Sequence, residues 1–515
     1  MNQQPTRAVV AGILLAGTLQ AADWSQYRGP HLDGSTPEAV RTNWAEKPLQ
    51  TVWKKSLDPG WSSIAVSGGR LVTQVRKGTR EYCVALDAAT GTELWTRETE
   101  VASYDNLVGY DDRVDGPRST PTISGEFAYV LTSQLKLHCL RLRDGGVVWT
   151  RDFVTEFGSE VISWQNAASP LLVDGLIFLN SNAPGRRLMA VRASDGTTVW
   201  EGSDDPTTHA TPAYGEVGGV PTVVFLTGLG LVGVMPETGQ VRWRLTFLPS
   251  FTSTAATPVL ANDRVYASAA YGFGAISARI TPGPSGPFVS QPWRQRGTAY
   301  QNHWSTPVAH EGFLYSVVES GTVDQIRVRS LACLDLVAGT NRWVSTSVGS
   351  RTIGFGSVIK VADLLLVLTE SGELVLVRPD PVAYSEITRQ KILTQYCWNV
   401  PVVSAGRLYA RSSSELIALD VGAAPPALPE LDLAVRPGPD SSAVVAVVSG
   451  RNGAPLDANA AGRIELRGTT ELTQPLADWL AIPADWQVVG TRLESGISSS
   501  SNTRFLRAQE KSAGP

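Results

Sequence analysis

Short apolar runs separated by turn residues repeat along most of the chain. In one unit the apolar run LLV at 171–173 is followed by DG at 174–175 and then by LIFL at 176–179. Asp-Gly pairs supply the positive φ that tight hairpins need, and β-branched and aromatic residues favour strands. The pattern therefore predicts antiparallel hairpins of short strands rather than long helices.

Two phrases mark the repeat. The first is a Gly four residues before a Trp, at Gly91 and Trp95, Gly145 and Trp149, Gly196 and Trp200, Gly239 and Trp243, and Gly339 and Trp343. The second is a small or hydroxyl residue followed by Pro and an apolar strand, at Pro121, Pro170, Pro212, Pro258 and Pro307, with prolines 42 to 49 residues apart. A four-stranded antiparallel unit at this period is a propeller blade.

Degenerate copies fill the rest of the region. One unit opens at 62–64 and ends at Trp95, another opens at 356–358 without a Trp, and the last opens at 399–401 and ends one strand short at Asp420. The early strand 49–57 has no unit of its own and carries Trp53, placed like a repeat Trp. Pairing it with the last unit predicts an all-β, eight-bladed propeller of four-stranded antiparallel blades over 23–421, with its ring closed and its edges removed.

The flanks predict export and a second domain. Residues 1–22 combine Arg7, an apolar run at 8–16 and small residues at the end, which is typical of a secretory signal peptide. That run is about half the ~20 residues that a membrane span needs, so we expect no membrane span and a periplasmic or extracellular location. Residues 422–430 indicate a Pro-rich linker, and the alternating segment 431–510 predicts a small, β-sandwich-like domain.

Composition narrows the partners. Lys plus Arg total 44 against 48 Asp plus Glu, a net charge of −4, so no basic field is available for nucleic acid. The chain holds 15 Trp but 5 His, which favours a Trp-anchored repeat over a His-rich metal centre. The four cysteines match no zinc motif, and their sparse spacing favours buried free thiols at Cys83, Cys139, Cys333 and Cys397.

The chain resembles the pyrroloquinoline-quinone-like β-propeller repeat family over 23–421. The matching features are WSQYRGP at 24–30, GPRSTP at 116–121 and the Gly-to-Trp phrases. The resemblance implies an eight-bladed ring in which each repeat Trp docks on the neighbouring blade: Trp53, Trp95, Trp149, Trp200, Trp243 and Trp343. The family includes quinoprotein alcohol dehydrogenases, outer-membrane assembly factor propellers and exported proteins of unassigned role.

Two departures separate the chain from the specific branches of that family. Methanol-oxidising quinoproteins resemble one another in a pair of adjacent cysteines beside the cofactor, and no two cysteines are adjacent here. The assembly-factor branch looks like a lipoprotein, whereas the first cysteine of this chain is Cys83. Neither specific function is therefore expected to transfer directly.

The candidate site is one end of the propeller channel. The residue three positions before the Pro position of each blade should lie at a common mouth, and these residues are Trp61, Arg118, Ala167, His209, Ala255, Trp304, Phe355 and Trp398. His303 is adjacent to one of them. Aromatic faces with Arg and His predict a ligand pocket formed by Trp61, Arg118, His209, His303, Trp304, Phe355 and Trp398. The alternative is that bulky residues plug the channel.

The loop 98–118 adds four carboxylates, Asp105, Asp111, Asp112 and Asp115. Such a cluster could bind Ca²⁺, which takes six to eight oxygens. It has no EF-hand order of ligands, and its alternative interpretation is a solvated loop. No metal site is assigned from it.

Two functions remain open. The first is an exported, monomeric binding module that holds a small molecule, a glycan or a protein at its mouth without chemistry of its own. The second is a dehydrogenase that uses pyrroloquinoline quinone with Ca²⁺ to oxidise an alcohol or sugar, as the resemblance suggests. There Trp304 or Trp398 would stack the cofactor, Arg118 would polarise it, and the base would come from the Asp105 to Asp115 loop.

Overall fold

A computed structural model describes residues 23–104, 115–249, 254–284, 286–323, 326–345, 353–394 and 396–422, together with strand segments between 431 and 510. It separates into two compact units, one formed by Ala21–Ala423 and the other containing Ala424–Pro515. The expected signal peptide 1–22 and residues 423–430 of the expected linker lie outside the described residues.

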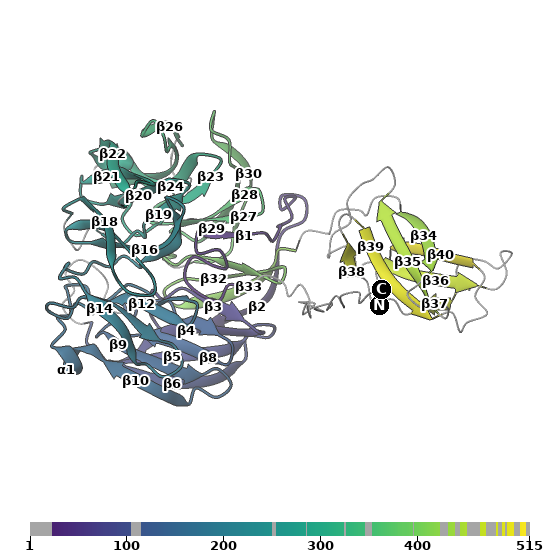
Figure 1. Cartoon of the computed structure of the whole chain (residues 1–515), viewed down its shortest axis with the longest axis horizontal. Helices are drawn as coiled ribbons and strands as arrows, with labels where there is room; N and C mark the ends of the chain where they lie inside the picture. Colours follow the sequence, from purple (N-terminus) through teal and green to yellow (C-terminus); the bar gives the residue numbers. More distant parts are fainter. Residues whose placement is uncertain are drawn as a thin grey trace, which may run out of the picture. The chain divides into compact units, whose positions relative to one another are not determined.

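The larger unit is a β-propeller, and its described strands form eight sheets (Figure 1). The all-β propeller predicted from the repeat is therefore confirmed. Blade 1 consists of β3 (Ala65–Ser67), β4 (Arg70–Lys77), β5 (Arg80–Asp87) and β6 (Glu93–Val101), and blade 2 of β7 (Thr122–Ser124), β8 (Phe127–Leu131), β9 (Lys136–Arg141) and β10 (Val147–Asp152). Blade 3 consists of β11 (Leu171–Val173), β12 (Leu176–Asn180), β13 (Leu188–Arg192) and β14 (Thr198–Gly202), and blade 4 of β15 (Ala213–Val217), β16 (Val220–Thr227), β17 (Gly230–Val234) and β18 (Val241–Thr246). Blade 5 consists of β19 (Val259–Ala261), β20 (Arg264–Ala269), β21 (Gly274–Thr281) and β22 (Phe288–Gln295), and blade 6 of β23 (Val308–His310), β24 (Phe313–Val323), β25 (Ile326–Asp335) and β26 (Thr340–Val344). Blade 7 consists of β27 (Ser357–Val361), β28 (Leu364–Leu368), β29 (Glu373–Arg378) and β30 (Ser385–Lys391).

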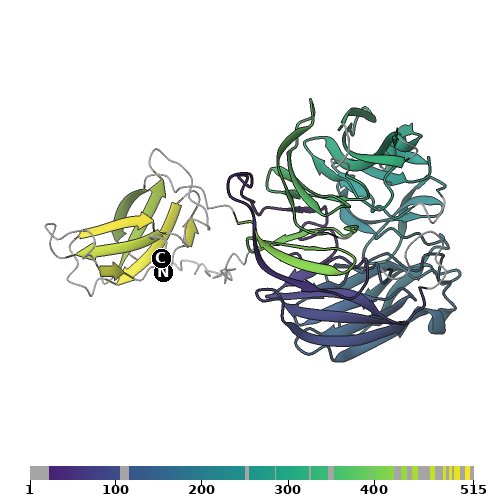
Figure 2. The same ribbon diagram turned by 180° about the vertical axis from the view of Figure 1, so that it is seen from behind.

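The eighth blade is built from both ends of the propeller sequence. It consists of β31 (Val402–Ser404), β32 (Arg407–Arg411), β33 (Glu415–Asp420) and β2 (Gln50–Ser56). The early strand β2 pairs antiparallel with β33, with Trp53 opposite Ala418, and the two lie side by side in Figure 1 and Figure 2. The innermost strand β3 contacts both β31 and β7, so blade 1 is flanked by blade 8 and blade 2.

Adjacent blades are joined by tryptophans of the outer strands, which we call the seam tryptophans: Trp53, Trp95, Trp149, Trp200, Trp243, Trp293 and Trp343. Six of them donate an indole N–H to a backbone carbonyl of the next blade, at 2.7 to 3.1 Å: Trp53 to Ala88, Trp95 to Leu142, Trp149 to Ala193, Trp200 to Pro236, Trp293 to Leu336 and Trp343 to Asp380. Trp243 is buried, and its indole nitrogen has no hydrogen-bond partner among the described residues.

The repeat glycine is the surface on which the preceding seam tryptophan lies. Gly239 has φ +70, and a Cβ built there would come within 2.4 Å of the Trp200 ring. Trp53, Trp95, Trp149 and Trp293 lie on Gly91, Gly145, Gly196 and Gly339 in the same way. The Gly therefore satisfies two requirements at once, a left-handed turn and a close approach of an indole. Trp293 was absent from the sequence prediction and completes the set for blade 5.

The segment preceding blade 1 lies across the channel. The carbonyls of Trp24 and Ser25 accept hydrogen bonds from Val66 of blade 1 and Ile123 of blade 2, and the Gln26 side chain pairs with the backbone of Leu172 in blade 3. The segment then reaches the opposite blades. Arg28 donates to the Thr306 and Pro307 carbonyls of blade 6, and β1 (Ser35–Thr36) pairs parallel with β27 of blade 7.

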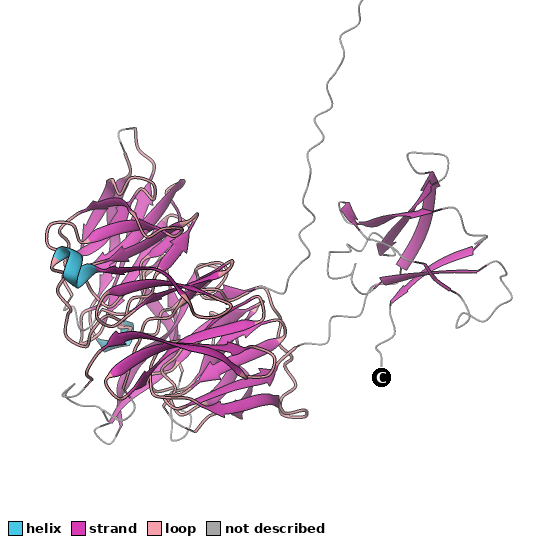
Figure 3. Cartoon of the chain, turned by 90° about the horizontal axis from the view of Figure 1, so that it is seen from below, coloured by secondary structure: helices cyan, strands magenta, loops and turns pink. Residues whose placement is uncertain are grey.

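The smaller unit contains two sheets. One has the order β34 (Leu431–Pro437), β35 (Ala443–Gly450), β39 (Arg492–Ser498), β38 (Gln487–Val489), and the other has the order β37 (Leu480–Ile482), β36 (Ile464–Thr469), β40 (Phe505–Glu510). The small carboxy-terminal β domain predicted from alternation is therefore present. Helix is scarce in the described chain, being α1 (Phe153–Phe157) and the 3-10 turn η2 (Thr298–Tyr300) (Figure 3). No described helix is long and apolar enough to cross a membrane.

Candidate functional site

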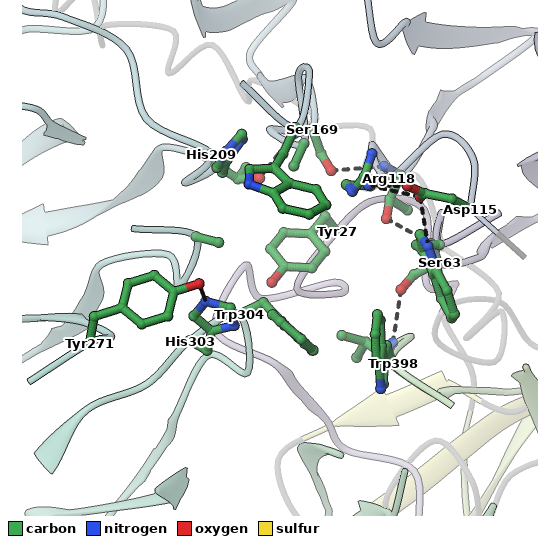
Figure 4. A pocket seen from close by; sticks show the side chains of 17 residues that line it. Tyr27, Ser63, Asp115, Arg118, Ser169, His209, Tyr271, His303, Trp304 and Trp398 are labelled. Atoms are coloured by element: carbon green, nitrogen blue, oxygen red, sulfur yellow. Dashed lines mark hydrogen bonds and ion pairs between the residues drawn. The ribbon is translucent and has the colours of Figure 1, made fainter. Parts of the chain in front are cut away.

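The residues predicted at the channel mouth converge in the structure. Trp61, Arg118, His209, His303, Trp304 and Trp398 line one cavity of about 180 Å³, which we call the mouth cavity (Figure 4). Phe355 instead lines a second cavity of about 320 Å³. Tyr271, His303 and Trp304 belong to the walls of both cavities. Their common position follows from the propeller, because each rim residue precedes the innermost strand of its own blade.

One side of the mouth is a continuous aromatic wall formed by Trp61, Trp304, Phe355 and Trp398. The ring centroids of Trp61 and Trp398 are 4.5 Å apart, those of Trp398 and Trp304 are 4.9 Å apart, and those of Trp304 and Phe355 are 4.2 Å apart. These residues come from blades 6, 7, 8 and 1. The rim residues of blades 2 to 5 are the smaller or polar set Arg118, Ala167, His209 and Ala255, and Trp164 and Tyr271 add aromatic side chains to this side of the lining.

Carboxylates fix the orientation of this wall. The Trp61 indole N–H donates to Asp115 at 2.9 Å, and Arg118 donates to both oxygens of the same carboxylate at 2.8 and 2.9 Å. The Trp398 indole N–H donates to Glu370 at 2.6 Å. Asp115 is almost fully buried, so its charge is balanced by Arg118 inside the protein rather than by water.

The loop that carries Trp61 is held by a buried arginine. Arg411 of blade 8 is fully buried and donates to the carbonyls of Gly60 at 2.9 Å, Ser62 at 3.1 Å and Gln74 at 3.0 Å. Burial lowers the pKa of Arg411 to about 9. Its hydrogen bonds join blade 8 to blade 1 directly behind the aromatic wall.

Two buried polar nitrogens of the mouth, Nδ1 of His303 and Nε1 of Trp304, have no hydrogen-bond partner among the described residues. Burial and, secondarily, the charge of Arg118 lower the pKa of His209 to about 3, while hydrogen bonding to the backbone of Ser163 and Gln165 acts in the opposite direction. Burial, followed by the charge of Arg329, lowers the pKa of His303 to about 4. Both imidazoles are therefore neutral at pH 7.

Side-chain hydroxyls of blades 1 to 4 also line the cavity, and we call them the hydroxyl belt: Ser63, Thr120, Ser169 and Thr211. Each hydroxyl oxygen accepts a backbone N–H from the preceding blade: Val400 to Ser63 at 2.8 Å, Ser63 to Thr120 at 3.2 Å, Thr120 to Ser169 at 2.9 Å and Ser169 to Thr211 at 2.9 Å. This explains the hydroxyl residue of the Pro phrase, which joins neighbouring blades at the axis. The hydroxyl protons donate to no described group and remain available to a ligand.

Three further lining residues were missed by the sequence analysis. Tyr27 belongs to the segment that lies across the channel, and its hydroxyl is 3.2 Å from Thr306 Oγ1. Trp164 and Tyr271 have left-handed backbone, with φ of 67° and 56°. Non-glycine residues rarely adopt this conformation, and it concentrates at functional sites. The Tyr271 hydroxyl lies 3.1 Å from His303 Nε2.

The second cavity carries the other charged pair of the rim. Glu319 and Arg329 line it beside Gln301, and Gln301 hydrogen-bonds Glu319 at 3.3 Å. The guanidinium carbon of Arg329 is 3.2 Å from the Phe355 ring centroid, a cation–π contact. A charged side chain therefore contacts the aromatic wall at both ends, Arg329 at Phe355 and Asp115 at Trp61.

Of the carboxylate cluster considered for Ca²⁺, Asp115 alone lies among the described residues. Asp115 is occupied by Arg118 and Trp61, and Asp105, Asp111 and Asp112 lie outside the described residues. Over the part of the chain that the structure describes, no group of three or more His, Cys, Asp or Glu could hold a metal ion. All four cysteines are buried.

Pyrroloquinoline quinone, which the resemblance implies, does not fit the described residues. It is a flat tricyclic quinone with three carboxylates, so it needs cations and an open slot between aromatic faces. The lining offers one cation, Arg118, already paired with Asp115. Trp304, Phe355 and Trp398 pack on one another instead of flanking a slot. A triply charged ligand would bury uncompensated charge here.

The repeat region matches a known protein family. A model of the family described as outer membrane protein assembly factor BamB matches residues 80–345. BamB of Yersinia pestis is 26% identical over 229 residues, 41% of this chain and 51% of that protein. BamB of Moranella endobia is 24% identical over 205 residues, 36% of this chain and 47% of that protein. The chain thus spans about half the length of the curated relatives it matches.

Among solved structures, the quinohemoprotein alcohol dehydrogenase from Comamonas testosteroni superposes with a TM-score of 0.58 at 14% identity, covering 82% of this chain and 84% of that chain. At this identity the likeness is one of fold alone.

Proposed function

The chain belongs to the family described as outer membrane protein assembly factor BamB, and from this premise we propose that it is an exported propeller that binds a protein or ligand at its aromatic mouth without chemistry of its own. Membership confirms the resemblance to pyrroloquinoline-quinone-like propellers. The family description supports a role in protein assembly at the outer membrane, and hence a periplasmic location. We further propose that the chain acts as a monomer, with residues 422–430 as linker and 431–510 as a separate module.

One observation carries the proposal. The mouth is concave, and its wall combines stacked aromatic rings with buried nitrogens that lack partners among the described residues, on His303 and Trp304. A buried polar atom without a partner costs free energy comparable to a lost hydrogen bond, so such a wall is better explained by an occupant than by a plug. The alternative that bulky residues merely fill the channel would favour apolar atoms in these positions.

The rival function, a quinone-dependent dehydrogenase, finds no support in the chemistry of the described residues. The fold is shared with such enzymes, but the described lining holds one cation, Arg118, already paired with Asp115, and no open slot between aromatic faces. We therefore propose binding rather than dehydrogenation.

The experiment compares capture by the full chain and by Trp304→Ala plus Trp398→Ala, using envelope proteins and immobilised glycans as bait. The control is Phe288→Ala plus Val382→Ala, which removes apolar side chains that are 63% and 78% exposed outside both cavities. We expect the control to retain capture and the mouth variant to lose it. Equal capture by both variants, for every bait bound, would refute the mouth as the binding site.

A further inference from the structure

The described lining of the mouth cavity carries no net charge. Asp115 and Arg118 are its charged lining residues, and they neutralise each other through a two-point ion pair. His209 and His303 are held neutral because burial lowers the pKa of each below its ordinary value. A charged ligand would therefore enter without a counter-charge, whereas a neutral ligand would pay no such cost.

The cavity is nevertheless rich in hydrogen-bonding groups. The hydroxyl belt offers four O–H donors whose oxygens are already used by backbone N–H groups of neighbouring blades. The unpartnered nitrogens of His303 and Trp304 and the imidazole of His209 lie in the same lining. Tyr27 adds a hydroxyl from the segment across the channel. The matching ligand is neutral and carries many hydroxyl or carbonyl oxygens.

The shape of the cavity sets the size of that ligand. At about 180 Å³ it is smaller than the ~300–1,000 Å³ typical of pockets for drug-sized ligands, so it suits one ring rather than a fused tricycle. The second cavity, of about 320 Å³, adjoins it through Tyr271, His303 and Trp304, and can receive a neighbouring ring. Because the segment carrying Tyr27 lies across the channel, the site suits the end of a chain rather than its middle.

These observations rest on the proposed function and specify its ligand. We propose that the mouth cavity binds the neutral, polyhydroxylated end of a glycan, with one sugar ring against the aromatic wall and its hydroxyls on the hydroxyl belt, His209 and the Asp115–Arg118 pair. A sugar ring presents C–H groups on its faces and hydroxyls at its rim. Aromatic faces attract the former through their negative quadrupole, and the belt, the pair and the free nitrogens bond the latter.

The test is calorimetric titration of the full chain with neutral trisaccharides of glucose, mannose, xylose and N-acetylglucosamine, and with trigalacturonate as the acidic counterpart of equal length. We expect one-to-one binding of at least one neutral trisaccharide at ligand concentrations up to about 10 mM, and at least about tenfold weaker binding of trigalacturonate. A titration with the corresponding monosaccharide distinguishes a free sugar from the end of a glycan. Tighter binding of the trisaccharide than of the monosaccharide would indicate that both cavities are used.

Variants locate the site. Trp304→Phe and His209→Leu should each weaken the trisaccharide at least about tenfold, while Phe288→Ala leaves its affinity unchanged. A measurement without variants guards against misfolding: bound trisaccharide should reduce acrylamide quenching of tryptophan fluorescence in the unaltered protein. No binding by any neutral trisaccharide, tighter binding of trigalacturonate, or equal affinity in all variants would overturn the inference. If the mouth still captures a protein but binds no sugar, only this inference is wrong. If the mouth binds neither a sugar nor a protein, the proposed function is wrong as well.

Discussion

The tryptophans at the blade seams and those at the channel mouth differ in what their indole nitrogens contact. At the seams, Trp200 and five others donate to a backbone carbonyl of the next blade. At the mouth, Trp61 and Trp398 donate to carboxylates and Trp304 has no partner among the described residues. The backbone repeats from blade to blade, so a side chain that bonds to it is structural. Side chains that bond to non-repeating groups carry what is specific to this propeller.

The largest effect expected at a seam comes from removing its indole. Trp200→Ala should lower the free energy of unfolding by about 3 to 5 kcal/mol, as the loss of a large buried aromatic does. Urea unfolding of the full chain measures it. An unchanged unfolding transition of the propeller would contradict the assignment of Trp200 to a seam.

The glycine beneath the same indole gives a matched pair of variants. Gly239→Ala should cost about 3 kcal/mol, because it strains a left-handed residue and displaces the Trp200 ring. Gly175 has a similar φ of +76 with nothing within 4 Å of an added Cβ, so Gly175→Ala should cost about 1 kcal/mol. If both variants lose the same stability in thermal unfolding, the cost comes from the left-handed turn alone and the indole contact contributes nothing.

The mouth, unlike the seams, should make stability depend on pH. Burial, and secondarily Arg118, lower the pKa of His209 from 6.5 to about 3, so the unfolded chain takes up a proton before the folded chain does. Neutral His209 contributes fully to the free energy of unfolding above about pH 6.5, and this contribution is lost as the pH falls toward 3. The loss amounts to about 2 kcal/mol at pH 5.

His209→Phe isolates that contribution. Its unfolding free energy should fall less than that of the unaltered protein between pH 7.5 and pH 5, whereas Trp200→Phe should shift the curve by a constant amount. Parallel curves for His209→Phe and the unaltered protein would show that this imidazole is not buried in its neutral form.

The smallest effect distinguishes two seams. Trp200 donates a hydrogen bond to Pro236 and Trp243 donates none to a described residue. Trp243→Phe should therefore cost about 1 kcal/mol less than Trp200→Phe in chemical unfolding, since both lose similar apolar area but only one loses a hydrogen bond. A larger loss for Trp243→Phe would refute this ordering.

The sequence contains most of the information about the seams. Gly239 and Trp243 recur at fixed spacing because each blade must both receive one indole and supply the next. Trp293 escaped prediction because β22 has no Gly four residues before it. Its signal lay one blade later, at Gly339, a repeat glycine for which no preceding tryptophan had been assigned.

The residues of the mouth could be predicted only in part from the sequence. Trp61, Arg118 and Trp398 could be predicted because they stand at a fixed offset from the repeat phrase, which the fold converts into a common rim. Trp164 and Tyr271 could not, because they reach the cavity through left-handed loop conformations that residue type does not reveal. Side-chain pairing, such as that of Asp115 with Arg118, depends on loop paths and is equally invisible in one sequence.

The measurement that separates the two regions most directly combines affinity and stability in two variants. Trp304→Phe should weaken the tightest neutral trisaccharide at least about tenfold and change the unfolding free energy by no more than about 1 kcal/mol. Trp200→Phe should do the reverse, with unchanged affinity and a loss of about 2 kcal/mol. If affinity instead falls in proportion to stability in both variants, the mouth and the seams are one structural network and the assignment of binding to the mouth is wrong.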